Sequence, residues 1–218
     1  MIPITQMHKI SAYVQSSKER TRTALLDAAE RSLARFGYAK LTMELIAEEA
    51  GLARRTAYLY FRSKEDVVLG TVDRIVDRVD ARLTALAALE APAADRLQRM
   101  LVARVMVRAE AVQEYHRALD NLFASLRATL LERRRTYFER ESHQLAAVVR
   151  EGQRAGELAA GDARKTGALL ILCTNALLPH GLSETDFADH AALERRSHAV
   201  ARLLLDGIRQ HPTRKKGS

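Results

Sequence analysis

The sequence of 218 residues contains few of the residues that cross-link a chain or interrupt its helices. It has one cysteine, four prolines and no tryptophan, and aromatic residues make up only 5% of it. The single cysteine, Cys173, excludes an intramolecular disulfide. Alanine, leucine, arginine and glutamate are abundant instead, which is typical of helical proteins. We therefore predict an all-α fold.

Long hydrophobic runs are also missing. The most apolar stretch, residues 168–179, falls far short of the roughly 20 residues that a membrane-spanning helix needs. We interpret it as a buried helix in which Cys173 is an inert core thiol. Residues 1–17 mix charged and polar side chains without the apolar core of a secretion signal. We expect a cytoplasmic protein that makes no contact with membranes.

Charge is unevenly divided along the chain. The net charge is +8 and the isoelectric point is about 9.9, which suits a polyanionic partner. Residues 1–64 contain 11 Lys and Arg against 6 Asp and Glu, whereas residues 65–218 contain 24 against 21. Most of the excess positive charge therefore lies in less than a third of the chain.

The N-terminal region begins with the periodicity of amphipathic helices. The first helix is predicted from about residue 18 to residue 36, with Ser17 as its N-cap and Gly37 as its end. Its apolar stripe consists of Leu25, Ala29, Leu33 and Phe36. Thr42 is the predicted N-cap of a short second helix, which Gly51 breaks.

The remainder of the chain predicts further helices, about nine in total. Ser63 and Asp66 form an imperfect capping box for a long fourth helix, and Pro92 takes the first position of the next. Helical periodicity continues to about residue 155, with a break between residues 109 and 121. A loop is predicted at Gly152, Gly156 and Gly161. The two last helices are predicted over residues 163–178 and 186–210.

Four segments follow from these patterns. We predict a flexible N-terminal arm at residues 1–17, a small helical domain at 18–64, a larger helical domain at 65–211 and a disordered tail at 212–218. The basic residues near the arm either remain disordered or reach a DNA groove, and the sequence leaves both open. These residues are Lys9, Lys18, Arg20 and Arg22.

Two short helices joined by a glycine-containing turn are the requirement for a helix-turn-helix. The turn is predicted at residues 50–53, and the second of its helices runs from Arg54 to Phe61. On a helical wheel, one arc of this helix is cationic and aromatic and consists of Arg54, Arg55, Tyr58 and Leu59, while Ala57 and Tyr60 lie on the other side. Such a face can enter a major groove, where arginine donates to guanine and apolar groups touch thymine methyls.

The same region resembles the TetR family of regulators over roughly residues 20–79. The matching residues are Thr42, Ile46-Ala47, Ala50-Gly51-Leu52, Thr56, Tyr58, Tyr60-Phe61 and Ser63-Lys64-Glu65. The resemblance implies phosphate contacts at Thr42, Thr56, Tyr58, Tyr60 and Lys64, and contacts with base edges at Ala53, Arg54, Arg55 and Leu59. Tyr60 is off the exposed arc, which leaves a packing role open for it.

Two positions depart from the family pattern. Ala53 stands where a small polar residue is usual, so the recognition helix lacks a side-chain N-cap, at a cost of roughly 1 kcal/mol. Arg55 stands where a small residue is frequent. We therefore expect an unusual operator preference.

The resemblance also implies that residues 18–64 are a helix-turn-helix DNA-binding domain and that residues 65–211 are a helical ligand-binding and dimerisation domain. One recognition helix contacts few base pairs, so a symmetric dimer is expected on a palindromic operator. The predicted dimer surface is Ala168, Leu169, Leu172, Ala176, Ala199 and Leu203, although part of it can pack within one subunit. The resemblance further implies a cavity for a small-molecule effector, and we take as candidate lining residues Met100, Met106, Tyr115, His116, Phe123 and Tyr137, for which ordinary core or surface positions are the alternative.

Other classes of function find less support in the sequence. It has no glycine-rich phosphate loop with lysine and no nucleophile elbow, and its histidines are not spaced as metal ligands. The charged runs at residues 132–135 and 195–196 would suit a protein-interaction module, but such runs are usually solvated faces. We predict a DNA-binding transcriptional regulator. The family resemblance favours a repressor that a small-molecule ligand releases from its operator. We expect no catalytic activity, cofactor or metal.

Overall fold

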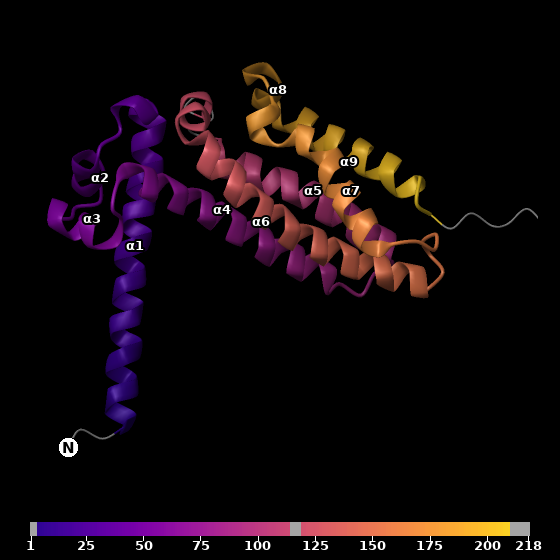
Figure 1. The fold of residues 1–218 in the computed structure, drawn as a ribbon, viewed down its shortest axis with the longest axis horizontal. Helices are drawn as coiled ribbons and strands as arrows, with labels where there is room; N and C mark the ends of the chain where they lie inside the picture. The colour runs from indigo at the N-terminus through magenta and orange to yellow at the C-terminus, as the bar shows by residue number, and fades with distance from the viewer. Residues whose placement is uncertain (1–3, 114–118, 210–218) are drawn as a thin grey trace, which may run out of the picture. The chain divides into compact units, whose positions relative to one another are not determined.

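The structure is a computed structural model that describes residues 4–113 and 119–209, and the side chains of residues 16–113 and 125–209 (Figure 1). Within these residues the fold consists of nine α-helices and two short 3-10 turns, and no strand is present. The all-α prediction and the predicted number of helices are confirmed. None of the described helices is both long and apolar enough to cross a membrane.

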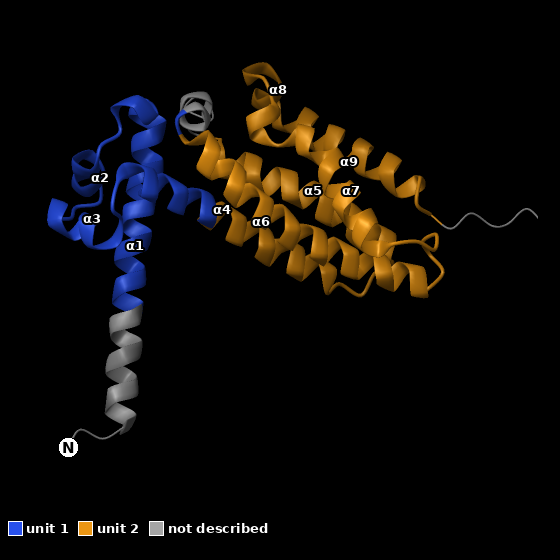
Figure 2. Cartoon of the chain, in the orientation of Figure 1, with its two compact units in different colours: residues 1–73, 117–125 blue, residues 74–116, 126–218 orange. Residues whose placement is uncertain are grey.

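The chain forms two compact units (Figure 2). Unit 1 comprises residues 1–73 and 117–125, and unit 2 comprises residues 74–116 and 126–218. The division falls inside helix α4 (Lys64–Ala87), whereas the sequence prediction places the domain boundary at the start of that helix.

Helix α1 (Ile4–Lys40) is longer than the sequence predicts. It begins at Ile4 and not near residue 18, because residues 4–17 contain neither proline nor glycine to stop a helix. Ser17 is therefore not an N-cap. It lies inside α1, where its carbonyl accepts a hydrogen bond from the Thr21 hydroxyl at 3.1 Å. Gly37 interrupts the helix as predicted, with a φ of 72°.

Helices α2 (Met43–Glu49) and α3 (Arg54–Tyr60) form the predicted helix-turn-helix. Thr42 caps α2, because its Oγ1 accepts a hydrogen bond from the amide of Leu45 at 3.2 Å. Gly51 adopts a φ of 66°, which a side chain would strain, and this conformation reverses the chain between the two helices. Ala53 precedes α3 without a side-chain cap, as predicted.

The core of unit 1 lies where α1, α2, α3 and the first turns of α4 meet. The predicted stripe of α1 is buried at Leu25, Ala29 and Leu33, but Phe36 is exposed beside the break at Gly37. The other fully buried apolar residues here are Leu26, Ala28, Leu41, Ile46, Ala57, Val67 and Val68. Ser63 caps α4 through the amide of Asp66, whereas Asp66 accepts from the amide of Arg62, so the capping box is imperfect.

Unit 2 contains the rest of α4 and helices α5 (Ala93–Val112), α6 (Leu119–Arg154), α7 (Ala163–Thr174), α8 (Glu184–Ala188) and α9 (His190–Asp206). The 3-10 turns η2 (Asn175–Leu177) and η3 (Pro179–Gly181) follow α7. Helix α9 packs against both α5 and α7. Helix α5 ends at Val112, which confirms the predicted break between residues 109 and 121.

Three predicted boundaries in unit 2 are wrong. Pro92 is the N-cap of α5 and not its first residue. The last predicted helix is two helices, because Asp189 has a non-helical backbone and caps α9 with its carboxylate. Gly152 belongs to α6 and not to a loop. A Cβ at this position would lie 2.7 Å from Cβ of Ala93 and 2.8 Å from Cδ1 of Leu158. Gly152 thus permits close packing.

A buried ion cluster lies inside unit 2 and consists of Arg104, Arg108 and Glu141. Arg104 on α5 is completely buried, and its Nε donates to Glu141 on α6 at 2.9 Å. Its terminal nitrogens donate to Thr174 Oγ1 at 2.6 Å and to Asn175 Oδ1 at 3.0 Å. Arg108 donates to the other Glu141 oxygen. The cluster therefore connects α5, α6 and the end of α7.

Two more ionisable side chains adjoin this cluster. Arg134 on α6 is half-buried with its guanidinium carbon 4.8 Å from the centre of the Phe138 ring, so the run at residues 132–135 is not simply a solvated face. His180 in η3 remains exposed on one side. Partial burial, and then the charges of Arg134, Arg108 and Arg104, lower its pKa to about 4.

We predict that His180 destabilises the protein in mild acid. An unfolded histidine binds a proton below its ordinary pKa of 6.5, whereas folded His180 stays neutral down to about 4. Stability is therefore unaffected by this group above 6.5 and decreases as the pH falls from 6.5 toward 4. Because His180 is partly solvated, we expect a loss of about 1 kcal/mol at pH 5.

Urea denaturation followed by circular dichroism at pH 7.5, 6.5, 5.5 and 5.0 measures this effect. The His180→Gln variant should lose less stability than the original chain over the same range. Parallel pH profiles for the two proteins would show that His180 titrates normally in the folded state.

Candidate nucleic-acid interface

Helix α3 presents one exposed face and one anchored face in unit 1. Ala57 points into the core and is completely buried, and Phe61, which follows α3, is 4% exposed. On the other side, Leu59 leaves 77% of its surface in solvent and Tyr58 leaves 43%. The neighbouring residues Arg54 and Arg55 are also exposed, so this face of α3 presents cationic, aromatic and apolar side chains together.

The charged end of this face is organised by an ion pair that the sequence analysis did not identify. Arg54 on α3 lies 2.6 Å from the carboxylate of Glu44 on α2, and its guanidinium carbon is 5.5 Å from the centre of the Tyr58 ring. Hydrogen bonding to its own backbone and the charge of Arg54 hold the pKa of Glu44 below its ordinary value. Glu44 is therefore ionised at neutral pH beside the exposed face.

A second basic residue is held at the start of α4. Lys64 Nζ donates to the carbonyl of Tyr38 at 3.3 Å and lies 4.6 Å from the centre of its ring. The Tyr38 hydroxyl donates to Glu65 at 3.2 Å. Burial, followed by the adjacent Glu65 carboxylate, raises the pKa of Tyr38 to about 12. Lys64 is thus a positioned cation and not a freely rotating one.

Two ion pairs hold α2 against α1. Arg31 Nε donates to Glu49 at 2.7 Å, and Arg31 also donates to the carbonyl of Glu49 at 3.1 Å. Arg35 lies 3.3 Å from the other Glu49 oxygen. Because the pairs are largely exposed and screened by solvent, they contribute little to stability, and their effect is mainly to orient the last turn of α2.

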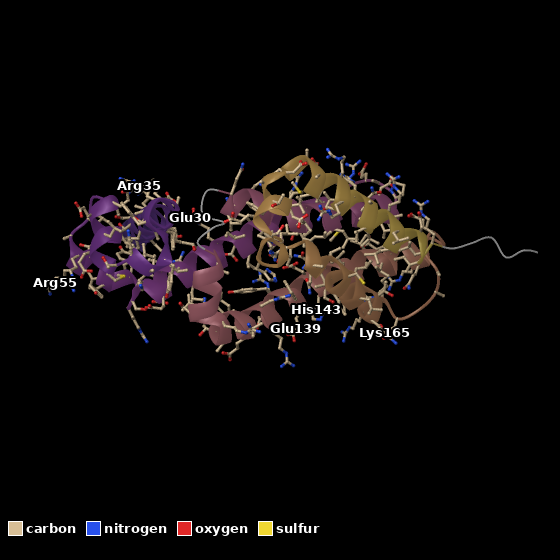
Figure 3. All side chains as sticks on the ribbon, turned by 90° about the horizontal axis from the view of Figure 1, so that it is seen from above. Glu30, Arg35, Arg55, Glu139, His143 and Lys165 are labelled. Carbon is tan, nitrogen blue, oxygen red and sulfur yellow. The ribbon has the colours of Figure 1, made fainter. Side chains whose placement is uncertain are left out.

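The predicted contact residues are placed on two levels of exposure. Thr42, Ala53, Arg54, Arg55, Tyr58 and Leu59 are exposed, and Figure 3 shows Arg55 at the outer edge of its unit. Thr56, Tyr60 and Lys64 are half-buried. Their assignment to phosphates or base edges stays a prediction. Of the basic residues near the arm, Arg22 packs over the Phe61 ring at 5.6 Å, while Lys18 and Arg20 are exposed.

The candidate effector residues differ in burial, and only three of their six side chains are described. Met100 is completely buried in the core of unit 2, and Met106 and Tyr137 are half-buried. Tyr115 and His116 lie outside the described residues, as does the side chain of Phe123. Their part in a cavity stays a prediction. The sequence analysis did not identify the buried ion cluster, because charged residues at single helical positions look like solvated ones.

The predicted dimer surface is exposed in the single chain. Ala168, Leu169, Leu172, Ala176, Ala199 and Leu203 all lie on the surface of α7, η2 and α9. Leu172 and Leu203 leave 65% and 75% of their surface in solvent. Cys173 lies among them and is exposed, so its interpretation as an inert core thiol is wrong. It faces away from the core because α7 buries its other side, including Leu170 and Ile171.

Comparison with known proteins agrees with the arrangement in unit 1. The sequence profile described as bacterial regulatory proteins, tetR family, matches residues 25–79. The HTH-type transcriptional regulator EthR of Mycobacterium tuberculosis is 35% identical over 109 residues, which are 50% of this chain and 49% of that protein. The chain therefore spans about half the length of the curated relatives of this kind that it matches.

Solved structures share the fold over most of the chain. A TetR transcription regulator from Haloarcula marismortui superposes with a TM-score of 0.70 at 21% identity, over 88% of this chain and 100% of that one. SmeT, the repressor of a Stenotrophomonas maltophilia multidrug efflux pump, gives a TM-score of 0.67 at 19% identity, over 90% of this chain and 94% of that one.

The profile match contains every motif residue from Thr42 to Glu65 on which the sequence resemblance rests, including the left-handed Gly51 and the anchored Phe61. The helices that carry these residues are the ones the family pattern requires. Over residues 25–79 the chain is therefore similar to the TetR family of bacterial regulatory proteins.

Proposed function

We propose that the chain is a dimeric, sequence-specific DNA-binding repressor that a small-molecule ligand releases from a palindromic operator. The observation that carries this proposal is the exposed face of α3, formed by Arg54, Arg55, Tyr58 and Leu59 above a buried Ala57. Such a face combines donors for guanine with apolar contacts for thymine methyls. Residues 1–64, which contain the helix-turn-helix, also carry 11 Lys and Arg against 6 Asp and Glu, and this positive excess favours a polyanion.

The relatives support regulation as the purpose of DNA binding. EthR is described as a transcriptional regulator and SmeT as the repressor of an efflux pump. Neither description is that of an enzyme, and we propose that this chain is likewise not an enzyme. We also place it in the cytoplasm, where it would meet bacterial DNA.

The apolar face of α7 and α9 supports the dimer. Leu169, Leu172 and Leu203 are large, exposed and on two helices that pack against each other. Exposed leucines gathered on adjacent helices are typical of a protein interface. A symmetric dimer formed through such faces would carry two copies of α3, one for each half-site of a palindromic operator.

Selection from a pool of random duplexes at near-physiological salt tests the function directly. We expect the full-length protein to enrich an inverted repeat, because each half-site meets one recognition helix of a symmetric dimer. Failure of folded, ligand-free protein to enrich any sequence would refute the proposal.

We predict that Arg54 reads bases and that Lys64 contacts phosphates. Arg54→Ala should weaken binding to the selected duplex by about 1 to 3 kcal/mol and relax the preference at particular base pairs, with a smaller effect on random DNA. Lys64→Gln should weaken binding to both duplexes alike and reduce the salt dependence by about one ion. Fluorescence anisotropy titrations over a range of salt concentrations measure both. Equal losses on both duplexes for Arg54→Ala would contradict its assignment.

We further predict that Glu44 limits binding to the wrong DNA. Its carboxylate neutralises Arg54 in the free protein and repels phosphates, so Glu44→Gln should increase affinity for random DNA several-fold. The matched control is Glu48→Gln, which removes an equal charge from an exposed position on the same helix. The same anisotropy assay with random duplex compares them, and equal effects would show that only the net charge matters.

The dimer surface gives a separate prediction. Leu203→Glu should convert the dimer into a monomer at micromolar concentration, because two charges would be buried opposite each other in the interface. The control is Leu131→Glu, which changes a leucine that is 50% exposed on α6, outside α7 and α9. Sedimentation equilibrium gives the mass of each variant. A Leu203→Glu protein that keeps the mass of the dimer would exclude this surface.

A further inference from the structure

Among the described residues, the group of charged side chains around Glu141 in unit 2 has more cations than carboxylates. Three arginines, Arg104, Arg108 and Arg134, interact electrostatically around His180, and Glu141 is the carboxylate paired with two of them. Glu141 is 2% exposed and is already shared by Arg104 and Arg108. With His180 neutral at pH 7, the group retains a surplus of about two positive charges.

Arg134 differs from Arg104 and Arg108 because no ion pair holds it among the described residues. Among the described residues, no carboxylate or hydrogen-bond acceptor pairs with its guanidinium, whose contact is the face of Phe138 at 4.8 Å. The same ring also has Arg104 at 5.2 Å. Burial and then the charge of Arg108 lower the pKa of Arg134. A half-buried guanidinium with unused donors beside other cations is unfavourable unless an anion approaches it.

The surroundings of Arg134 suit a particular kind of anion. Guanidinium donors match the two oxygens of a carboxylate or the oxygens of a phosphate. Phe138 offers an apolar surface next to them and is half-buried against the core of unit 2. His180, exposed on one side, borders the same group, so the cluster is reachable from solvent. A molecule that combines an oxyanion with an apolar body fits both features.

We propose that unit 2 binds a small organic anion, whose carboxylate or phosphate group pairs with Arg134 beside the buried ion cluster. This assignment gives the chemical class of the effector, and in that respect it rests on the proposed function. Binding of the anion itself involves unit 2 alone and is independent of DNA. Since the cluster connects α5, α6 and the end of α7, an anion at its edge would act on the packing of these helices.

Thermal unfolding of the full-length protein without DNA tests the site. The probes are benzoate, phenyl phosphate and inorganic phosphate, with benzyl alcohol and benzylamine as neutral and cationic counterparts of similar size. We expect benzoate or phenyl phosphate to raise the Tm with a saturable concentration dependence, and the two counterparts to leave it unchanged. A response to inorganic phosphate equal to that of phenyl phosphate would overturn the apolar part of the proposal.

Variants separate Arg134 from general charge effects. Arg134→Gln should weaken binding of the active probe at least tenfold by calorimetry, and Arg134→Lys should retain part of the affinity because it keeps the charge but loses the planar pair of donors. The matched control is Arg135→Gln, since Arg135 is the next residue of α6 but is 85% exposed and pairs with Glu139. Equal affinities for the Arg134→Gln and Arg135→Gln proteins would overturn the proposal.

The charge of Arg134 can also be tested by thermal unfolding of the ligand-free protein, whatever the ligand is. Removing an uncompensated cation should raise the Tm of the free Arg134→Gln protein at low salt relative to the Arg135→Gln protein, and added salt should reduce this difference. An Arg134→Gln protein that is less stable at all salt concentrations would show that the cation is already compensated. Release of DNA by the bound anion is measured in a separate assay. An anion that binds to unit 2 without releasing DNA would refute the effector role and leave the anion site supported.

Discussion

Arg104 is the interaction on which the arrangement of unit 2 depends. A guanidinium with no exposure has to find an acceptor for each of its nitrogens, and the acceptors come from α6, from α7 and from η2. Removal of Glu141 would leave two buried cations without a counter-ion, at a cost of roughly 3 to 5 kcal/mol. The positions of α5, α6 and α7 thus depend on one side chain. The same side chain therefore affects which surface of α7 is exposed.

In unit 1, helix α3 has only about two turns and is not stable by itself. Its stability comes from apolar contacts on one side, where Ala57 and the following Phe61 are buried. The ion pairs around Arg31 and Glu49 are exposed and contribute much less. The outer face of α3 is therefore free to vary in charge and shape without loss of the fold.

The two units also use arginine in opposite ways. In unit 1, Arg54 and Arg55 are exposed, so their charges are screened by salt and suit a large, flexible polyanion. In unit 2, Arg104 is buried, its charge costs desolvation, and burial lowers its pKa to about 10. It stays charged at neutral pH, and charges held at low dielectric discriminate strongly between small ligands. The same residue type is thus exposed to solvent in one unit and buried and paired in the other.

The sequence by itself determined the helical class, the helix-turn-helix and the exposed arc of α3, because these depend on local features: the spacing of apolar residues, the Thr42 cap and the left-handed Gly51. It did not determine where α1 starts, since no residue between Ile4 and Ser17 stops a helix, nor the pairing of Glu44 with Arg54 across two helices. Only the tertiary structure decided that Arg104 is buried and Arg134 half-buried, while Cys173 is exposed. A charged side chain is buried or exposed according to which distant helix packs against it, and periodicity along one helix carries no record of that partner.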